Sequence, residues 1–105
     1  MASYPILKIN RAQIEAGIER AAQALSHDVV RIRYSLEDDW TGDPSIFFRV
    51  VITDEASRGK SLGELAYSID RRIEKEVDAL ELGLNPYSTF RTLSETVEMK
   101  EAEWE

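Results

Sequence analysis

Apolar residues recur every three or four positions near the start of the chain, which is the spacing of an amphipathic helix. The stripe consists of Ile14, Ile18, Ala21 and Leu25. Asn10 is placed to cap this helix, with Gln13 as its partner in a capping box. The pattern therefore predicts a helix that opens at Asn10, buries one face and ends near Asp28.

The next two segments alternate apolar and polar residues, as half-buried strands do. In residues 29–36 the apolar face is formed by Val30, Ile32, Tyr34 and Leu36. In residues 46–53 it is formed by Ile46, Phe48, Val50 and Ile52. The polar stretch from Glu37 to Pro44 joins them, so we expect an antiparallel hairpin with a long loop.

A second helical pattern follows the hairpin after a turn that we place at Asp54 to Lys60. It consists of Leu62, Leu65, Ile69, Ile73, Val77 and Leu80, with Ser61 and Glu64 as its capping box. Gly83 suits a left-handed C-terminal cap, and Leu84 is placed for a Schellman contact. We therefore expect one helix of about five turns, ending before Pro86.

The remaining residues predict a third strand and an acidic tail, for which a helix is one alternative. Tyr87 to Leu93 is rich in β-forming side chains, and a hairpin packed on helices needs a third strand for stability. We therefore expect one α+β domain at residues 1–93 and an acidic C-terminal tail at residues 94–105. The tail carries Trp104.

The resulting α-β-β-α-β order predicts an antiparallel or mixed sheet with two helices on one face. The fold would be ferredoxin-like if Tyr4 to Ile9 adds a strand, and otherwise similar to a type II KH domain. In both arrangements, the second face of the sheet is left for solvent or for a partner.

Composition narrows the class of protein. The 105 residues are 43% hydrophobic and 31% charged, as in an ordinary globular domain with one core. No cysteine, no secretion signal and no long apolar run are present, so we expect a cytoplasmic protein without disulfides or membrane contact.

The net charge is −7, to which the last eleven residues contribute −4, and this argues against a general nucleic-acid binder.

No residue set identifies catalysis, so we favour a non-catalytic role over an enzyme and expect no catalytic or metal residues. His27 is the only histidine and lacks an evident partner. Gly59-Lys60-Ser61 resembles the end of a P-loop, but Asp54 replaces its first glycine, so we expect no nucleotide cofactor. The acidic loop from Glu37 to Asp43 leaves a small enzyme or metal-binding domain as one alternative.

The second face of the predicted sheet is the strongest functional signal. Strand alternation places Arg31, Arg33 and Arg49 there with Phe47, Val29 and Val51, and Arg91 is a further candidate. We predict a protein–protein interaction or assembly module that self-associates as a homo-oligomer. Its expected contact residues are Arg31, Arg33, Phe47, Arg49, Trp40 and Trp104, with the arginines pairing carboxylates of a partner or of a second copy's tail.

A single-stranded RNA-binding module is the second alternative. Phe47 would stack on a base and the arginines would contact phosphates. The chain lacks the Gly-x-x-Gly sequence of a KH clamp and a second sheet aromatic, which disfavours this interpretation.

Three short stretches between Arg31 and Val51 resemble sequences of small bacterial proteins. They are Arg31 to Leu36, Trp40 to Pro44 and Ile46 to Val51. Some proteins of this kind accompany nucleotidyltransferase-type toxin–antitoxin pairs. The resemblance implies an accessory role and assigns no function to any residue.

Overall fold

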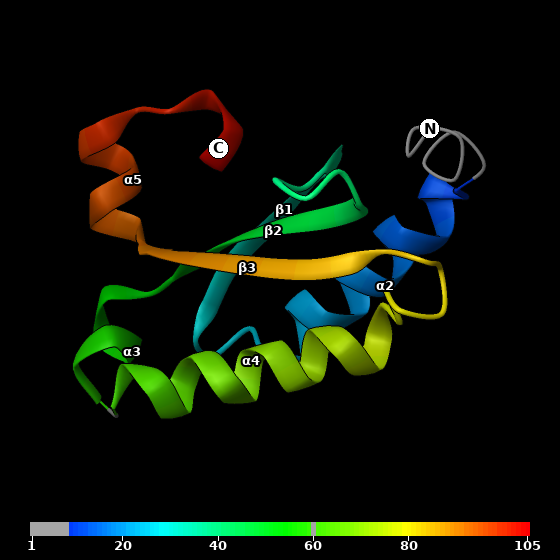
Figure 1. Cartoon of the computed structure of the whole chain (residues 1–105). Helices are drawn as coiled ribbons and strands as arrows, with labels where there is room; N and C mark the ends of the chain where they lie inside the picture. The colour runs from blue at the N-terminus through cyan, green and yellow to red at the C-terminus, as the bar shows by residue number, and fades with distance from the viewer. Residues whose placement is uncertain (1–8, 60) are drawn as a thin grey trace.

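The computed structural model describes residues 9–59 and 61–105, and Figure 1 shows the order of their elements. They are α2 (Arg11–Ala24), β1 (Val29–Asp38), β2 (Pro44–Ile52), α3 (Asp54–Gly59), α4 (Leu62–Glu76), β3 (Asn85–Thr92), α5 (Leu93–Met99) and the 3-10 turn η1 (Ala102–Trp104). Four α-helices and a three-stranded mixed sheet within these residues confirm the predicted α+β class.

The sheet has the order β1-β2-β3, with β2 in the centre. β1 and β2 form the expected antiparallel hairpin, whereas β3 pairs with β2 in parallel after the crossover through α3 and α4. The proposed strand at Tyr4 to Ile9 lies outside the described residues, apart from Ile9. β1 and β3 are therefore the two edge strands of the described sheet.

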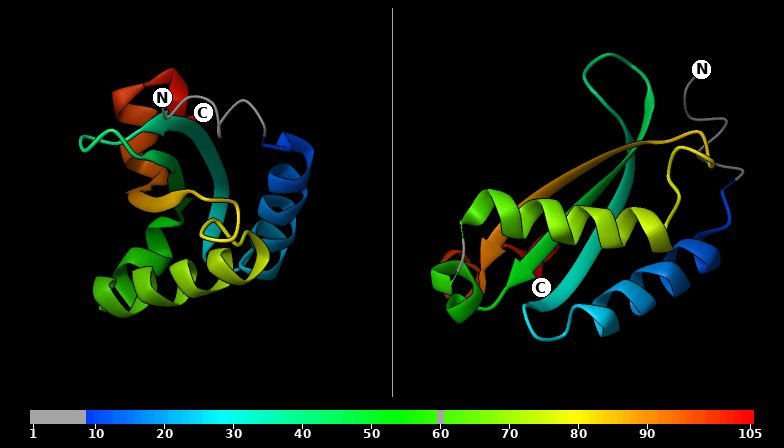
Figure 2. Two further views of the ribbon diagram at one scale, coloured as in Figure 1. Left: turned by 45° about the vertical axis from the view of Figure 1, so that its right-hand side comes forward. Right: turned by 90° about the horizontal axis from the view of Figure 1, so that it is seen from below.

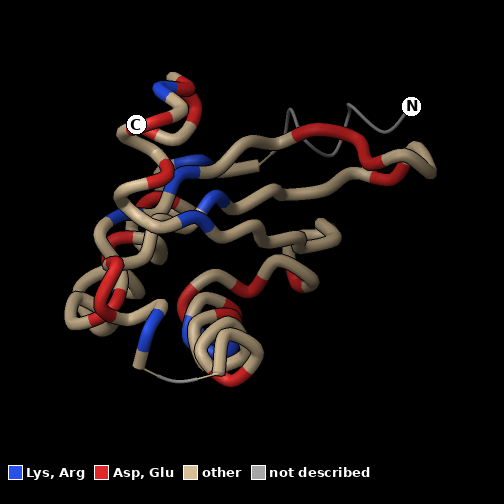
Figure 3. The backbone as a smooth tube through the Cα atoms, turned by 90° about the vertical axis from the view of Figure 1, so that its left-hand side faces the viewer, with Lys and Arg blue, Asp and Glu red and all other residues tan. Residues whose placement is uncertain are grey.

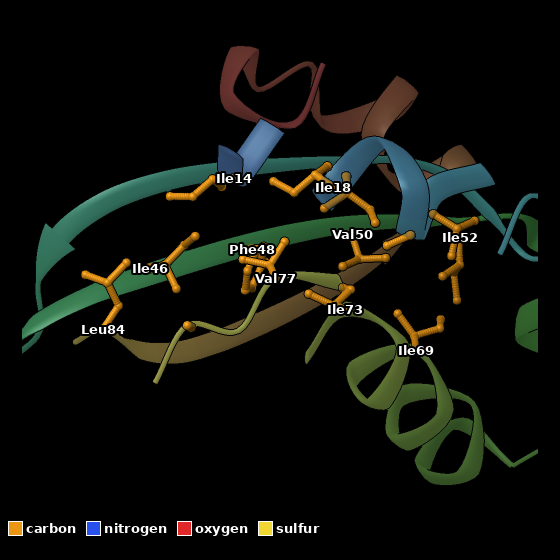
Figure 4. Packing of buried hydrophobic residues seen from close by; sticks show 14 of the residues in the cluster. Ile14, Ile18, Ile46, Phe48, Val50, Ile52, Ile69, Ile73, Val77 and Leu84 are labelled. Atoms are coloured by element: carbon orange, nitrogen blue, oxygen red, sulfur yellow. The ribbon is translucent and has the colours of Figure 1, made fainter. Parts of the chain in front are cut away.

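Helices α2 and α4 lie on one face of the sheet, as Figures 1 and 2 show. Figure 4 shows the core between them, where the apolar stripes of both helices meet the inner face of β2. The most deeply buried of these residues are Ile14, Ala21, Ile46, Phe48, Val50 and Ile69. This core explains why the helical and strand patterns were visible in the sequence.

The start of β1 differs from the prediction because of a β-bulge. The register shifts between Val29 and Arg31, so Val29 packs in the core and Val30 is 39% exposed. A bulge inserts one extra residue and reverses the alternation on one side of it. The assignment of Val30 to the core and of Val29 to the second face was therefore wrong, while Arg31 and Arg33 keep their expected face.

Helix α4 ends one turn earlier than predicted. It stops at Glu76, and Val77 is extended. The expected Schellman contact does form, with Leu84 N donating to Ala79 O and Gly83 N to Leu80 O, and Gly83 has a φ of 78°. It closes a separate turn, because α4 has already ended at Glu76 and Val77 is extended.

The close approach of α2 to the end of α4 occurs at Gly17. A Cβ atom on Gly17 would lie 2.5 Å from the main-chain oxygen of Glu76. Arg20 lies one turn further along α2, and its Nε donates to the Glu76 carboxylate at 3.0 Å. The helix end is therefore held by backbone contact and by charge, neither of which the apolar spacing of α4 reveals.

The segment after β2 is also more regular than predicted. Residues 54–59 form helix α3 rather than a turn. The hydroxyl of Thr53 accepts a hydrogen bond from the main-chain nitrogen of Ala56, which supplies the start signal for this helix. Among the helices of residues 9–59 and 61–105, none has the length and hydropathy that a membrane crossing requires.

Replacing Gly17 with alanine should destabilise the fold by about 1–3 kcal/mol, because a backbone oxygen occupies the space of the new methyl group. Gly63 is the matched control, since it is also helical and has open space around its Cα. Gly63→Ala should be neutral or stabilising by up to about 1 kcal/mol. Urea unfolding measures both changes, and equal effects would contradict the proposed contact.

Candidate functional site

Four arginines lie on the side of the sheet that α2 and α4 do not cover. We call this side the arginine face and define it by Arg31 and Arg33 on β1, Arg49 on β2 and Arg91 on β3. Figure 3 shows the basic positions of adjacent strands gathered beside the C-terminal part of the chain. The strands therefore collect cationic side chains from distant parts of an acidic sequence.

The register places like charges directly opposite each other. Arg33 pairs with Arg49 across β1 and β2, while Arg31 and Arg91 flank Val51 in the next row. Like charges at opposed positions destabilise a pair of strands unless other groups compensate them. Arg49 Nη1 donates to Ser35 Oγ at 3.1 Å, which satisfies only part of this need.

The compensation comes from residues 101–105, which we call the C-terminal segment. Arg49 Nε donates to the main-chain oxygen of Glu103 at 2.8 Å, and Arg31 Nε donates to that of Trp104 at 2.8 Å. Arg33 donates twice to the main-chain oxygen of Glu105, at 3.1 and 2.6 Å from Nε and Nη2. Three arginines therefore hold the backbone of one short peptide.

Trp104 anchors the C-terminal segment on the sheet. Its side chain is 5% exposed, and the guanidinium of Arg91 lies 4.4 Å from the ring centroid. Arg91 also forms an ion pair with Glu101. Val51 is fully buried and, like Trp104, stands outside the main core cluster, while Thr96 of α5 is buried as well. Because both η1 and α5 contact β2, we regard these residues as a second small core on this side of the sheet.

The basic end of the arginine face is consequently not open. From the sequence, we had expected this whole face to be left for solvent or for a partner. The predicted contact residues Arg31, Arg33 and Arg49 bind their own chain, and Trp104 is buried there. The chain reaches this position through α5, which Figure 1 shows on the opposite side of the sheet from α4. The acidic residues 94–105 thus comprise most of a helix, a turn and a docked peptide.

A local signal for α5 was present but was not used in the sequence interpretation. Thr92 and Glu95 form a reciprocal capping box that starts the helix. Asp54 accepts hydrogen bonds from the main-chain nitrogen and the hydroxyl of Ser94, and these lower the pKa of Asp54. Lys100 then adopts a left-handed conformation, with φ 55°, that turns the chain back toward the sheet.

The other end of the same face carries an aromatic cluster, formed by Trp40, Phe47 and Tyr87. Phe47 and Tyr87 are register partners on β2 and β3, and their rings stack with centroids 5.2 Å apart. The Trp40 ring leans on Tyr87, also at 5.2 Å, yet its residue is 79% exposed. Of the six predicted contact residues, Trp40 is therefore the most accessible large apolar one, and Tyr87 was missed because β3 had no assigned register.

Asp39 fixes the loop that carries Trp40. Its carboxylate accepts hydrogen bonds from the hydroxyls of Thr41 at 2.6 Å, Tyr87 at 2.9 Å and Ser45 at 3.2 Å, and from the main-chain nitrogens of Thr41 and Asp43. These donors hold the pKa of Asp39 well below its usual range, and the Thr41 hydroxyl has the largest effect. The carboxylate is therefore a structural link from the hairpin loop to β3.

The acidic loop does not form a recognisable reactive centre. Within residues 9–59 and 61–105, no three His, Cys, Asp or Glu side chains gather closely enough to hold a metal ion. In the same residues, every buried side-chain nitrogen or oxygen has a hydrogen-bond partner.

A cleft of about 450 Å³ lies between α4 and β3. Its acidic side chains are Asp70, Glu74 and Asp78, with Lys75 as the basic residue and Ser88 on the strand side. Burial raises the pKa of Asp70. The balance of charge makes this cleft unsuitable for a phosphate-bearing ligand.

No family model, curated protein or solved structure matches the chain. The site must consequently be interpreted from its own contacts.

Replacing Trp104 with alanine should lower the free energy of unfolding by up to about 3 kcal/mol, because it empties the small second core. Trp40→Ala is the matched control and should change stability by less than about 0.5 kcal/mol, since Trp40 is largely exposed. Chemical denaturation followed by circular dichroism measures both. Similar losses for the two tryptophans would disprove the assigned burial.

Asp39→Asn should lower the melting temperature at neutral pH, because the ionised carboxylate accepts most of the loop's hydrogen bonds. The pKa of Asp39 in the folded chain lies below its unfolded value of about 3.9, so the ionised carboxylate stabilises the fold above that pH. This contribution is lost as the pH falls below it. The difference from the native chain should therefore shrink between about pH 5 and pH 2. Asp38→Asn, at the exposed neighbour, is the control. A difference that stays constant with pH would refute this role.

Proposed function

We propose that the chain is a non-catalytic protein-interaction module that docks protein on the outer face of its sheet. The observation that carries this proposal is the aromatic cluster beside the arginine face, in which Trp40 is 79% exposed and Phe47 and Tyr87 are half-buried. Trp40, Phe47 and Tyr87 continue the surface that already holds a peptide at its basic end. The uncovered aromatic end is then the contact surface for a partner.

The composition of this surface supports protein docking. Aromatic side chains and arginine are the residues most enriched in the energetically dominant parts of protein interfaces. The loop of Trp40 is held by the Asp39 hydrogen bonds, so little conformational freedom is lost when this ring is buried. A second copy of the chain is the simplest partner. We therefore propose self-association through the aromatic cluster.

We further infer a fold closer to the type II KH arrangement than to the ferredoxin-like one. The direct parallel pairing of β2 and β3 supports this, because a ferredoxin-like split βαβ unit has another strand between the two that flank its helix. Such a fold would also suit single-stranded RNA. Two observations favour protein instead. Arg31, Arg33 and Arg49 already donate to the C-terminal segment, and the cleft between α4 and β3 is acidic.

Sedimentation of the native chain at tens of micromolar should show self-association. Trp40→Ala should weaken it about tenfold or more, which is the effect of truncating an interface hot spot. Tyr67→Ala is the matched control, because Tyr67 is 62% exposed on α4, outside the sheet face. A monomeric native chain, or equal effects of the two variants, would overturn self-association.

The RNA alternative is tested on the same samples with short single strands at low salt. Binding that weakens steeply with added salt and with Arg49→Ala would favour RNA over protein. The protein-docking proposal expects no measurable affinity.

A further inference from the structure

We propose that the basic end of the arginine face is a binding site for an extended acidic peptide containing tryptophan, and that the C-terminal segment occupies it as an internal ligand. This inference rests on the proposed docking role of the same sheet face and names the chemistry of a partner. The C-terminal segment itself, with the sequence Glu-Ala-Glu-Trp-Glu, shows what the site accepts.

The site recognises the peptide backbone first. Three guanidinium groups donate to three consecutive main-chain oxygens, those of Glu103, Trp104 and Glu105. The partners follow the strands in order, because Glu101 meets β3, Glu103 meets β2, and Trp104 and Glu105 meet β1. The peptide therefore crosses the strands, and its backbone contacts do not depend on side-chain identity.

Selectivity comes from two further contacts. The Trp104 ring is buried and receives the Arg91 guanidinium on its face, a cation–π arrangement. Arg91 also pairs with Glu101, so one arginine reads both the aromatic ring and the acidic residue three positions before it. A neutral peptide without tryptophan would lose both contacts and keep only those of its backbone.

The internal ligand is attached through a single turn. Lys100 is left-handed, a conformation that is unfavourable for a residue with a side chain relative to the right-handed form. The short attachment nevertheless gives the C-terminal segment an effective concentration on the order of millimolar. An external peptide must compete with this segment. The apparent affinity of the chain for that peptide is therefore reduced in proportion to the fraction of chains whose site is vacant.

The experiment uses the full chain and a labelled peptide with the sequence of residues 101–105, followed by fluorescence anisotropy. Trp104→Ala removes the internal anchor and should bind the peptide saturably, at least tenfold more tightly than the native chain. Lys100→Pro provides a second route, since proline cannot adopt the positive φ of Lys100 and all docking residues remain. It should likewise bind more tightly than the native chain.

Two controls define the site. Adding Arg49→Ala to Trp104→Ala, or replacing the tryptophan of the peptide with alanine, should weaken binding at least tenfold. Circular dichroism confirms that each variant is folded before binding is measured. No saturable binding by either folded variant, or equal affinity in native and opened chains, would overturn the site.

The outcomes also separate this inference from the proposed function. If Trp104→Ala, rather than Trp40→Ala, dissociates the self-associated chain, the occupant is the C-terminal segment of a second copy, and the assignment to a foreign peptide fails. If the peptide does not bind while Trp40-dependent association persists, only the inferred peptide site is lost.

Discussion

The contact between three arginines and the main-chain oxygens of residues 103–105 is the interaction on which the second side of the sheet depends. Arg33 and Arg49 stand opposite each other across β1 and β2, and this arrangement is unfavourable unless acceptors lie above them. The carbonyl oxygens of the C-terminal segment supply those acceptors. Trp104 is itself buried on this side of the sheet, where η1 lies against β2, so charge compensation and apolar burial act together in the same segment.

The outer face of the sheet is consequently divided into two parts with different properties. The part around Arg31, Arg33, Arg49 and Arg91 is occupied by the chain itself, whereas the part around Phe47 and Tyr87 is half-buried and carries the exposed Trp40. Asp39 connects the loop of Trp40 to β3 through the Tyr87 hydroxyl, which keeps the aromatic part in a defined arrangement. The outer face thus has an aromatic end with an exposed Trp40 and a basic end that holds residues 101–105.

Much of the architecture could be predicted from short-range patterns, and the failures have identifiable physical causes. Asn10 and Ser61 cap α2 and α4 by accepting hydrogen bonds from the main-chain nitrogens of Gln13 and Glu64, which a local pattern can predict because a cap depends on residues three positions away. The bulge at the start of β1 was hidden because Val29 and Val30 are the same residue type. Helix α4 ends at Glu76, where Gly17 of α2 approaches its last turn, and a contact between residues so far apart in the chain leaves no mark on the apolar spacing of α4.

The sequence by itself determined the α+β class, the two amphipathic helices and the side of β1 and β2 on which the arginines lie, because these follow from periods of two and of about 3.6 residues. It also contained the tryptophan and the acidic residues of the docked peptide. Only the tertiary structure decided that these groups meet within one chain. That outcome depends on where α5 and the left-handed Lys100 direct the backbone, and no local spacing encodes the distance between Trp104 and Arg91.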